Sequence, residues 1–331
     1  MKNRSTRKSR KNRESLFTGT ILFLIIVPII ATQLGCGSST EFKNGGAEGP
    51  EEGYAKPELL ISTEALSEIL DDPAHVIIDV RPKEEFRQGH IPGAINLQWT
   101  RFTHLLGPKF WQLLPLWLVE LHLGLSGITV DDTIVLYNDQ ETGWGEDGRF
   151  YSRFFRLFLV DLFFMGQRNV RILNGGWNLW VLEERETTTE TAGRRPSRYR
   201  AEVRPELLAD KSWMTEHYDD PDVHVIDSRS REEYDGAVLY GEARGGHVPG
   251  AESLHWRETI GPDYRIRPAS ELKQALDAVG VTEDAEVVVY CTGGVRSGHL
   301  FFVLELLGYP RIRNYDGSFW EWAADPTLPI E

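Results

Sequence analysis

Short apolar runs alternate with stretches of helical periodicity from about residue 57 to the C-terminus. Runs rich in Val and Ile and bounded by turn residues predict strands at 76–78, 134–137, 170–173, 223–226, 287–290 and 311–314. Apolar residues spaced three and four apart predict helices at 62–70, 149–162, 268–279 and 298–307. This alternation predicts an α/β fold in which a parallel sheet carries helices on both faces.

The same series of motifs occurs twice. A strand ends in Asp-x-Arg, and Glu-Glu-aromatic, Gly-His-x-Pro-Gly-Ala, a second strand and a glycine- and tryptophan-containing segment follow in the same order. These motifs begin at Asp79, Glu84, Gly89 and Asn174 in the first copy and at Asp227, Glu232, Gly246 and Asp316 in the second. The repeat indicates a duplicated domain. We predict one domain at 57–184, a linker at 185–204 that is poor in apolar residues, and a second domain at 205–331.

Residues 1–35 have the pattern of a secretory signal peptide, a basic start followed by an apolar stretch from Leu16 to Ala31. The segment resembles a bacterial lipoprotein signal, in which a cysteine becomes the lipidated first residue, and Gly35-Cys36 fits that pattern. Cys36 is therefore the expected lipidation site, with an uncleaved membrane anchor as the alternative. Both predict an exported protein on the periplasmic or envelope side of a bacterial membrane. Residues 36–56, rich in Gly, Glu and Pro, are expected to form a flexible tether.

The charge of the chain excludes one class of partner. Residues 1–35 hold seven Lys/Arg and one acidic residue, a charge of +6, so the −14 of the whole chain leaves −20 for residues 36–331. A body this acidic repels phosphates, and we expect no nucleic-acid partner. Two cysteines exclude a disulfide scaffold, and no Cys/His cluster has metal-ligand spacing. We expect neither a metal nor a cofactor.

The second domain carries a candidate nucleophile where a predicted strand becomes a predicted helix. Cys291 ends the strand at 287–290, and the loop Thr292-Gly-Gly-Val-Arg296 leads into the helix. Backbone N–H groups and the positive end of the helix dipole meet at such a place, where they favour a thiolate and bind anions. Gly293 and Gly294 allow the loop to curl tightly enough to point several N–H groups inward. The alternative interpretation is a buried, inert thiol.

Taken together, these motifs are similar to those of the tandem rhodanese family of sulfurtransferases, over about residues 57–331. The resemblance implies two rhodanese-like domains, an inactive N-terminal one and a C-terminal one whose cysteine, here Cys291, forms a persulfide. It implies small-molecule sulfur donors and acceptors as partners and a site that lies between the two domains. The loop residues expected to bind substrate are Thr292, Gly293, Gly294, Val295 and Arg296.

Three further details bear on the chemistry. Cys291 and Arg296 form Cys-x4-Arg, one residue shorter than the Cys-x5-Arg of related phosphatases, which favours sulfur over phosphate or arsenate chemistry. Relatives commonly carry a substrate-binding arginine where this chain has Glu233, and Arg244 is the expected substitute. We expect thiosulfate as the donor, with 3-mercaptopyruvate as the alternative. A persulfide carrier with a protein acceptor remains a second hypothesis.

The motifs that occur in both copies are expected to be structural. The first copy has Asn138 in place of the cysteine, and an amide cannot act as a sulfur nucleophile. Asp79/Arg81 and Asp227/Arg229 recur around both positions, so we expect them to hold a strand end to the neighbouring loop. The same argument applies to His90 and His247. An insertion at 139–148 is either a surface loop or a segment that reaches the site.

Overall fold

A computed structural model describes residues 53–107, 112–139 and 162–331. The predicted signal peptide, Cys36, most of the predicted tether, the insertion from residue 140 onward and nearly all of the helix predicted at 149–162 lie outside these residues. Residues 49–331 form one compact unit, distinct from residues 1–48. Within the described ranges, the structure contains no helix with the length and apolar character needed to span a bilayer.

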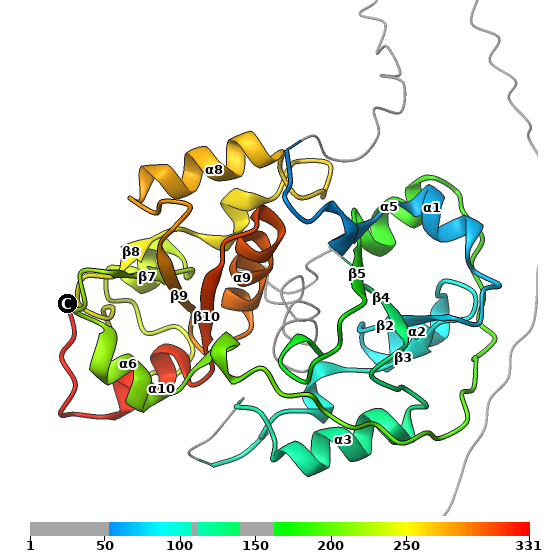
Figure 1. Ribbon diagram of the computed structural model, residues 1–331, viewed down its shortest axis with the longest axis horizontal. Coiled ribbons are helices and arrows are strands. Elements are labelled where there is room, and N and C mark those ends of the chain that lie inside the picture. The colour runs from blue at the N-terminus through cyan, green and yellow to red at the C-terminus, as the bar shows by residue number, and fades with distance from the viewer. Residues whose placement is uncertain (1–52, 108–111, 140–161) are drawn as a thin grey trace, which may run out of the picture. The chain divides into compact units, whose positions relative to one another are not determined.

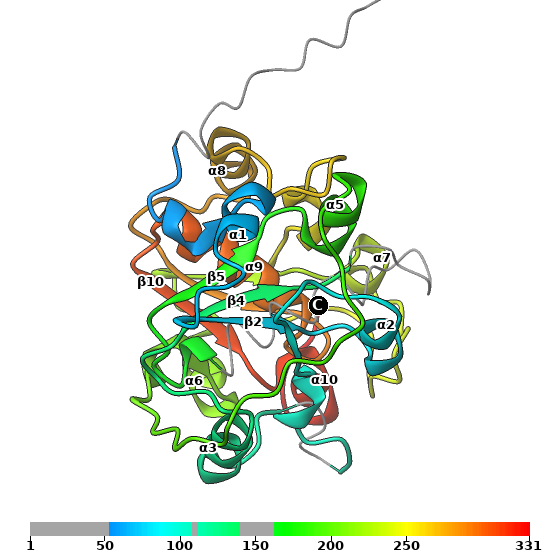
Figure 2. The ribbon, with the colours of Figure 1, turned by 90° about the vertical axis from the view of Figure 1, so that its right-hand side faces the viewer.

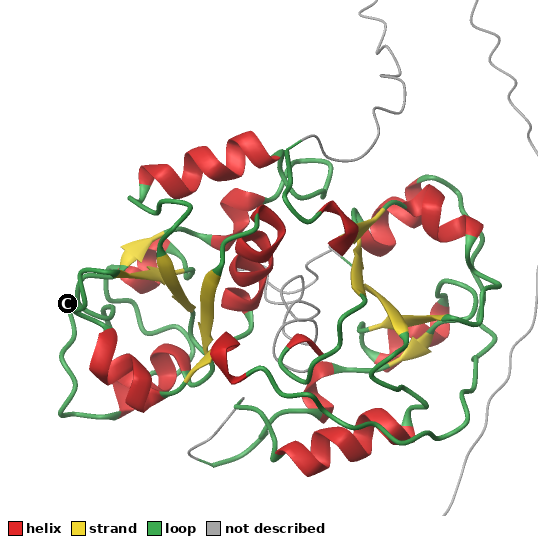
Figure 3. Ribbon diagram, in the orientation of Figure 1, coloured by secondary structure: helices red, strands yellow, loops and turns green. Residues whose placement is uncertain are grey.

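Two five-stranded parallel sheets with the same strand order form the framework (Figures 1 and 3). The first sheet has the order β1-β5-β4-β2-β3 and the second has the order β6-β10-β9-β7-β8. The strands of the first are β1 (Leu60–Ile61), β2 (His75–Asp79), β3 (Ile95–Asn96), β4 (Thr133–Tyr137) and β5 (Val170–Leu173). Those of the second are β6 (Leu208–Ala209), β7 (Val223–Asp227), β8 (Glu252–Ser253), β9 (Glu286–Tyr290) and β10 (Arg311–Tyr315). The predicted duplication and the α/β class are confirmed.

Helices pack around each sheet. The described ones are α1 (Thr63–Glu68), α2 (Lys83–Gln88), α3 (Leu116–Leu125), α5 (Gly176–Leu182), α6 (Lys211–His217), α7 (Arg231–Tyr234), α8 (Ala269–Ala278), α9 (Arg296–Leu307) and α10 (Ser318–Ala324). Several begin at a polar cap: Ser62 Oγ accepts from the Ala65 N–H, and Asp210 accepts from the Trp213 N–H. Every residue of α9 is buried, including the polar residues Arg296, His299 and Glu305.

The two Asp-x-Arg motifs have the structural role predicted for them. Arg81 Nη2 donates to Asp79 Oδ2 at 2.6 Å and to the Gly89 carbonyl, and Arg229 Nη2 makes the same contacts with Asp227 and Gly246. Each pair is buried and ties a strand end to the Gly-His-x-Pro-Gly loop. Because the arrangement is the same in the copy without a cysteine, it belongs to the architecture.

The histidines of the Gly-His-x-Pro-Gly loops are also structural. His90 stacks on Phe86 and His247 stacks on Tyr234, each with a centroid distance of 3.7 Å, and each Nδ1 bonds to the backbone carbonyl of its stacking partner. The backbone of each histidine also pairs with a segment that follows in the chain: His90 with Thr188, at the start of the predicted linker, and His247 with Glu331. Both histidines therefore hold loops in place.

Hydrogen bonds between the two halves involve equivalent positions. The side chain of Asn174, after β5, accepts from the Ile266 N–H at 3.2 Å, and the side chain of Asp316, after β10, accepts from the Leu113 N–H at 3.1 Å. Tyr54 adds a hydroxyl bond to the Arg267 carbonyl at 2.5 Å. The tether predicted at 36–56 thus ends before Tyr54, because Tyr54 is packed against the second half.

Candidate active site

Cys291 lies directly after β9, the central strand of the second sheet, at the start of the loop that leads into α9. Gly294 has φ +77, a left-handed conformation that favours glycine, so the sharp turn in the loop depends on this residue. The backbone of the loop is fixed from α10: Cys291 N donates to Ser318 Oγ, and the Phe319 N–H donates to the Cys291 carbonyl at 2.9 Å. Ser297 Oγ donates to the Cys291 Sγ at 3.7 Å.

The surroundings of Cys291 favour a thiolate. Burial alone would raise the pKa of the thiol, but the charge of Arg296, the N–H and hydroxyl of Ser297 and the N–H of Gly293 together lower it below its usual value. The residue exposes only 1% of its surface, so the thiol is held within the loop. An inert core thiol would have an apolar environment, whereas this one faces donors and a guanidinium.

Arg296, which is buried, forms a two-pronged ion pair with Glu233, the first residue that the sequence analysis failed to assign to the site. Nη1 lies 2.6 Å from Glu233 Oε2 and Nη2 lies 2.7 Å from Oε1. The Thr292 hydroxyl donates to Glu233 at 2.8 Å and accepts from Arg296 at 2.6 Å. Burial alone would raise the pKa of Glu233, but these bonds and the charge of Arg296 hold it at about 2. Arg296 therefore faces the thiol already paired with a carboxylate.

Two more residues that sequence reasoning missed lie near Arg296. The guanidinium carbon of Arg296 is 5.2 Å from the centre of the Tyr240 ring, a cation–π distance. Burial, the charge of Arg296 and that of Arg257 lower the pKa of His255 to about 4, so its imidazole is neutral at physiological pH. Neither residue stands in the loop motif, and only the folded chain brings them to it.

The other predicted substrate-binding residues fall into two groups. Thr292, Gly293, Gly294 and Val295 all lie in the loop between β9 and α9, where the sequence analysis placed them. Arg244 does not join them. Its guanidinium donates to the backbone carbonyls of Trp322, Ala323, Asp325 and Leu328, at the end of α10 and beyond. These four bonds use most of its N–H groups, so Arg244 anchors the C-terminal segment and the expectation that it binds substrate is withdrawn.

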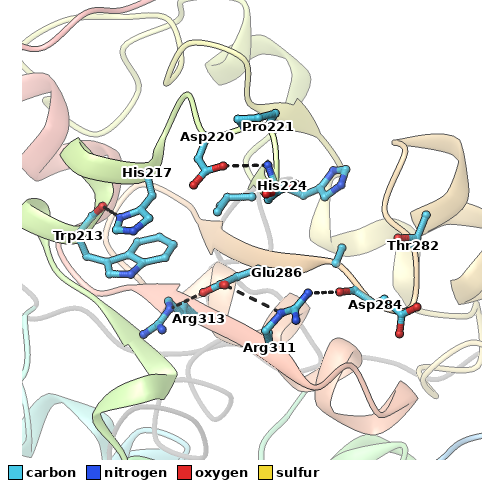
Figure 4. Close-up of a pocket in the computed structure, with 13 residues that line it drawn as sticks. Trp213, His217, Asp220, Pro221, His224, Thr282, Asp284, Glu286, Arg311 and Arg313 are labelled. Carbon is cyan, nitrogen blue, oxygen red and sulfur yellow. Dashed lines mark hydrogen bonds and ion pairs between the residues drawn. The ribbon is translucent and has the colours of Figure 1, made fainter.

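A separate depression of about 690 Å³ lies at the amino ends of the strands of the second sheet (Figure 4). It is lined by the first residues of β7, β9 and β10, whereas Cys291 follows the last residue of β9. Its arginines are paired: Arg313 Nε bonds to Glu286 at 3.1 Å, and Arg311 bonds to the Asp284 carbonyl. In parallel sheets catalytic groups collect at the carboxyl ends of the strands, which makes the Cys291 loop the candidate site.

Comparisons with known proteins agree with this geometry. The model of the rhodanese-like domain matches residues 62–183 and 210–325. The chain is 34% identical over 298 residues to the sulfur carrier protein TtuD of Thermus thermophilus, covering 84% of this chain and 98% of that protein.

The chain belongs to the rhodanese-like domain family. The chain is also 30% identical over 279 residues to a thiosulfate sulfurtransferase of Azotobacter vinelandii, covering 84% of this chain and 98% of that one. Among solved structures, the anaerobic ergothioneine biosynthesis enzyme of Chlorobium limicola shares the fold with a TM-score of 0.77 and 23% identity, over 84% of this chain and 71% of that one.

Proposed function

We propose that this protein is a sulfurtransferase that moves a sulfane sulfur through a persulfide on Cys291. The observation that carries the proposal is the position of the Cys291 thiol after the central strand, beside Arg296 and the N–H groups of Gly293 and Ser297, which lower its pKa. A thiolate at the amino end of a helix can attack sulfur, and the same N–H groups stabilise the anion that results. Family membership and relatives named thiosulfate sulfurtransferase support the same reaction class.

The first half-reaction loads the enzyme. The Cys291 thiolate attacks the outer sulfur of thiosulfate, a new S–S bond forms, and the old S–S bond breaks with its electron pair leaving on sulfite. The product, Cys–S–S⁻, carries its negative charge on the outer sulfur. The second half-reaction unloads it: an acceptor such as cyanide or a thiolate attacks that sulfur, and the Cys291 thiolate leaves. The two steps give double-displacement kinetics.

The Arg296–Glu233 pair shapes the first half-reaction. Arg296 lowers the pKa of Cys291, while Glu233 compensates much of its positive charge and fixes its orientation. Thiosulfate therefore meets few uncompensated positive charges around the loop. The choice of thiosulfate as the proposed donor therefore rests on the relatives named thiosulfate sulfurtransferase, with 3-mercaptopyruvate as the alternative, and the donor panel below decides between them.

A donor panel tests the proposal. Thiosulfate, 3-mercaptopyruvate and a polysulfide are each offered with cyanide as acceptor. The amount of sulfite, pyruvate or sulfide released is compared with the amount of thiocyanate formed. The proposal expects turnover with thiosulfate that is lost in Cys291→Ser. Equal turnover in both proteins would refute the assignment of Cys291, and turnover only with 3-mercaptopyruvate would replace the donor.

A persulfide carrier is the second candidate, favoured by the name of TtuD, a sulfur carrier protein, and by the small exposed area of Cys291. Both candidates form the persulfide. A carrier gives one equivalent of sulfite in a burst and then little steady-state turnover with cyanide, whereas an enzyme continues. Kinetics over several equivalents of thiosulfate separates the two.

We also propose that the protein is exported and lipid-anchored through Cys36, because residues 1–36 resemble a lipoprotein signal. Membrane fractionation of the wild type and of Cys36→Ala checks the anchor. Release of the body or failure of processing in the variant is the expected result. Unchanged fractionation and processing would favour the uncleaved anchor.

A further inference from the structure

Helix α3 presents apolar side chains to solvent. Trp117, Leu121 and Leu125 expose 65%, 47% and 59% of their surfaces, and their spacing of four residues places them on one face, here called the apolar stripe. The opposite face is buried in the core through Val119 and Leu123. A helix that is apolar on all sides is normally enclosed, so the apolar stripe requires an occupant.

The linker between the domains runs along one flank of this stripe. The Ser197 N–H donates to the Gly124 carbonyl at 2.8 Å, and the Ala201 N–H donates to Glu120 Oε1 at 2.9 Å. Since 197 pairs with 124 and 201 pairs with 120, linker and helix are antiparallel. Figures 1 and 2 both show the linker beside α3. The predicted linker is thus a packed, extended strip.

Arginines occupy the outer side of that strip. Tyr199 is buried, whereas Arg195, Arg198 and Arg200 are exposed, and these three form the arginine flank. No acidic residue stands between Glu190 and Glu202. On a body whose net charge is −20, three exposed arginines without an intervening acid form a local positive region beside an exposed apolar one.

We propose that the apolar stripe and the arginine flank together bind the surface of an anionic lipid bilayer. A tryptophan and leucines on one helix face enter the boundary between headgroups and acyl chains, and arginines beside them attract anionic headgroups. This surface is distant in sequence from the catalytic loop, and membrane binding would be a function separate from the proposed sulfur transfer. It would hold the body flat on the membrane instead of at the end of its tether.

The N-terminal segment keeps this surface within reach of a membrane. Sixteen residues lie between Cys36 and Gly53, where the described structure begins. Even fully extended, they span at most about 60 Å. Given the proposed anchor at Cys36, the folded body stays within about 60 Å of the membrane surface. This confinement raises the effective concentration of lipid at a weak binding surface.

Vesicle flotation tests the proposal on residues 49–331, which form a compact unit without the N-terminal segment. Vesicles contain phosphatidylcholine alone or with phosphatidylglycerol. We expect binding to the phosphatidylglycerol vesicles that weakens with salt, and a loss of at least about tenfold in Trp117→Ser/Leu121→Ser. Arg198→Gln/Arg200→Gln should lose about fivefold for each charge, because each basic residue contributes about 1 kcal/mol near an anionic surface.

A matched control and a second readout complete the test. Val181→Ser/Leu182→Ser removes exposed apolar residues from α5, where they expose 47% and 75%, and should bind vesicles like the wild type. Hydrogen exchange of α3 should slow on vesicles. The proposal is overturned if the wild type does not bind, if the α5 variant loses as much as the α3 variant, or if the α3 variant changes only the oligomeric state seen by light scattering, which would assign the stripe to a second copy.

Discussion

The N-terminal and C-terminal halves present the same framework with different groups at the same position. Asn138 and Cys291 both follow the central strand of their sheet. The Asn138 carbonyl accepts from the Trp177 N–H at 2.8 Å, and the Cys291 carbonyl accepts from the Phe319 N–H at 2.9 Å. The buried Asp–Arg pairs agree as well. What differs is the chemistry around that position, so the comparison separates architecture from catalysis.

The carboxylates next to the two positions have opposite partners. In the C-terminal half, Glu233 meets Arg296 and Thr292 and stays ionised. In the N-terminal half, the equivalent Glu85 meets Asp139. Burial, the hydrogen bond with Glu85 and its charge raise the pKa of Asp139 to about 8. One half thus has a cation that supports a thiolate, and the other has an aspartate, Asp139, whose protonated form is favoured by burial and by the neighbouring Glu85.

The largest expected effect comes from exchanging the residues that differ. Cys291→Ser should lower sulfur transfer by at least about a thousandfold, because a hydroxyl does not replace the thiolate nucleophile. The matched change in the other half, Asn138→Ser, should leave kcat/KM within about twofold. Thiosulfate:cyanide turnover measures both. A similar loss in the two variants would mean that the halves are not functionally distinct.

The next largest effect is expected from removing the buried carboxylate of Glu233. Its pKa falls from the ordinary 4.5 to about 2, which corresponds to about 3 kcal/mol of stability. Glu233→Gln should lose about that much at pH 7, whereas Glu85→Gln, which removes a carboxyl next to another carboxyl, should change stability by less than about 1 kcal/mol. Urea unfolding measures both.

The same ion pair predicts a pH dependence. Because the pKa of Glu233 is lowered on folding, its contribution is complete above pH 4.5 and is lost as the pH falls toward about 2. Wild-type and Glu233→Gln stabilities should therefore converge over that range. A constant difference between pH 7 and pH 2.5 would show that the pair does not stabilise the fold through charge.

A smaller effect is expected on the thiol itself. Arg296→Gln removes the positive charge that lowers the pKa of Cys291, so the midpoint for alkylation by iodoacetamide should move to higher pH and the rate at pH 7 should fall about tenfold. Arg296→Lys keeps the charge but not the two-pronged geometry, so its alkylation midpoint should lie between those of the wild type and Arg296→Gln. An unchanged midpoint in Arg296→Gln would assign the lowered pKa to the backbone N–H groups.

The smallest effect tests the N-terminal half. The raised pKa of Asp139 means that the acid stabilises the fold fully below its ordinary 3.8 and that this contribution is lost as the pH rises through about 8. Asp139→Asn should therefore be more stable than the wild type by about 1 kcal/mol at pH 9, because solvent screens much of the charge on this half-buried carboxylate, and equal at pH 4. Equal stabilities of Asp139→Asn and the wild type at both pH values would contradict the raised pKa of Asp139.

Much of the framework could be predicted from the sequence because the central strands are fully buried. Their continuous Val and Ile runs predicted β4, β5 and β9 to within one residue. Helices α5 and α10 were missed because they are short and start within the glycine-containing motifs. Helix α3 was missed because its apolar residues cover every side, which gives no periodicity to detect.

The site was predictable only as far as the local motif extends. Cys291 and the loop to Arg296 are contiguous and could be located from the sequence. Glu233 joins them from 63 residues away, through a bond to Arg296 that no local pattern reveals. Arg244 was misplaced for the same reason, since its backbone partners lie at the end of α10 and just after it, 78 to 84 residues further along the chain.

The most direct test of the central claim is the mass of the protein after exposure to thiosulfate without an acceptor. The account predicts an added mass of about 32 Da, one sulfur atom, mapped to Cys291 and removed by cyanide. Cys291→Ser should gain nothing, and Asn138→Ser should load like the wild type. Turnover by a wild type that never carries the added sulfur, or sulfur carried on another residue, would contradict the account.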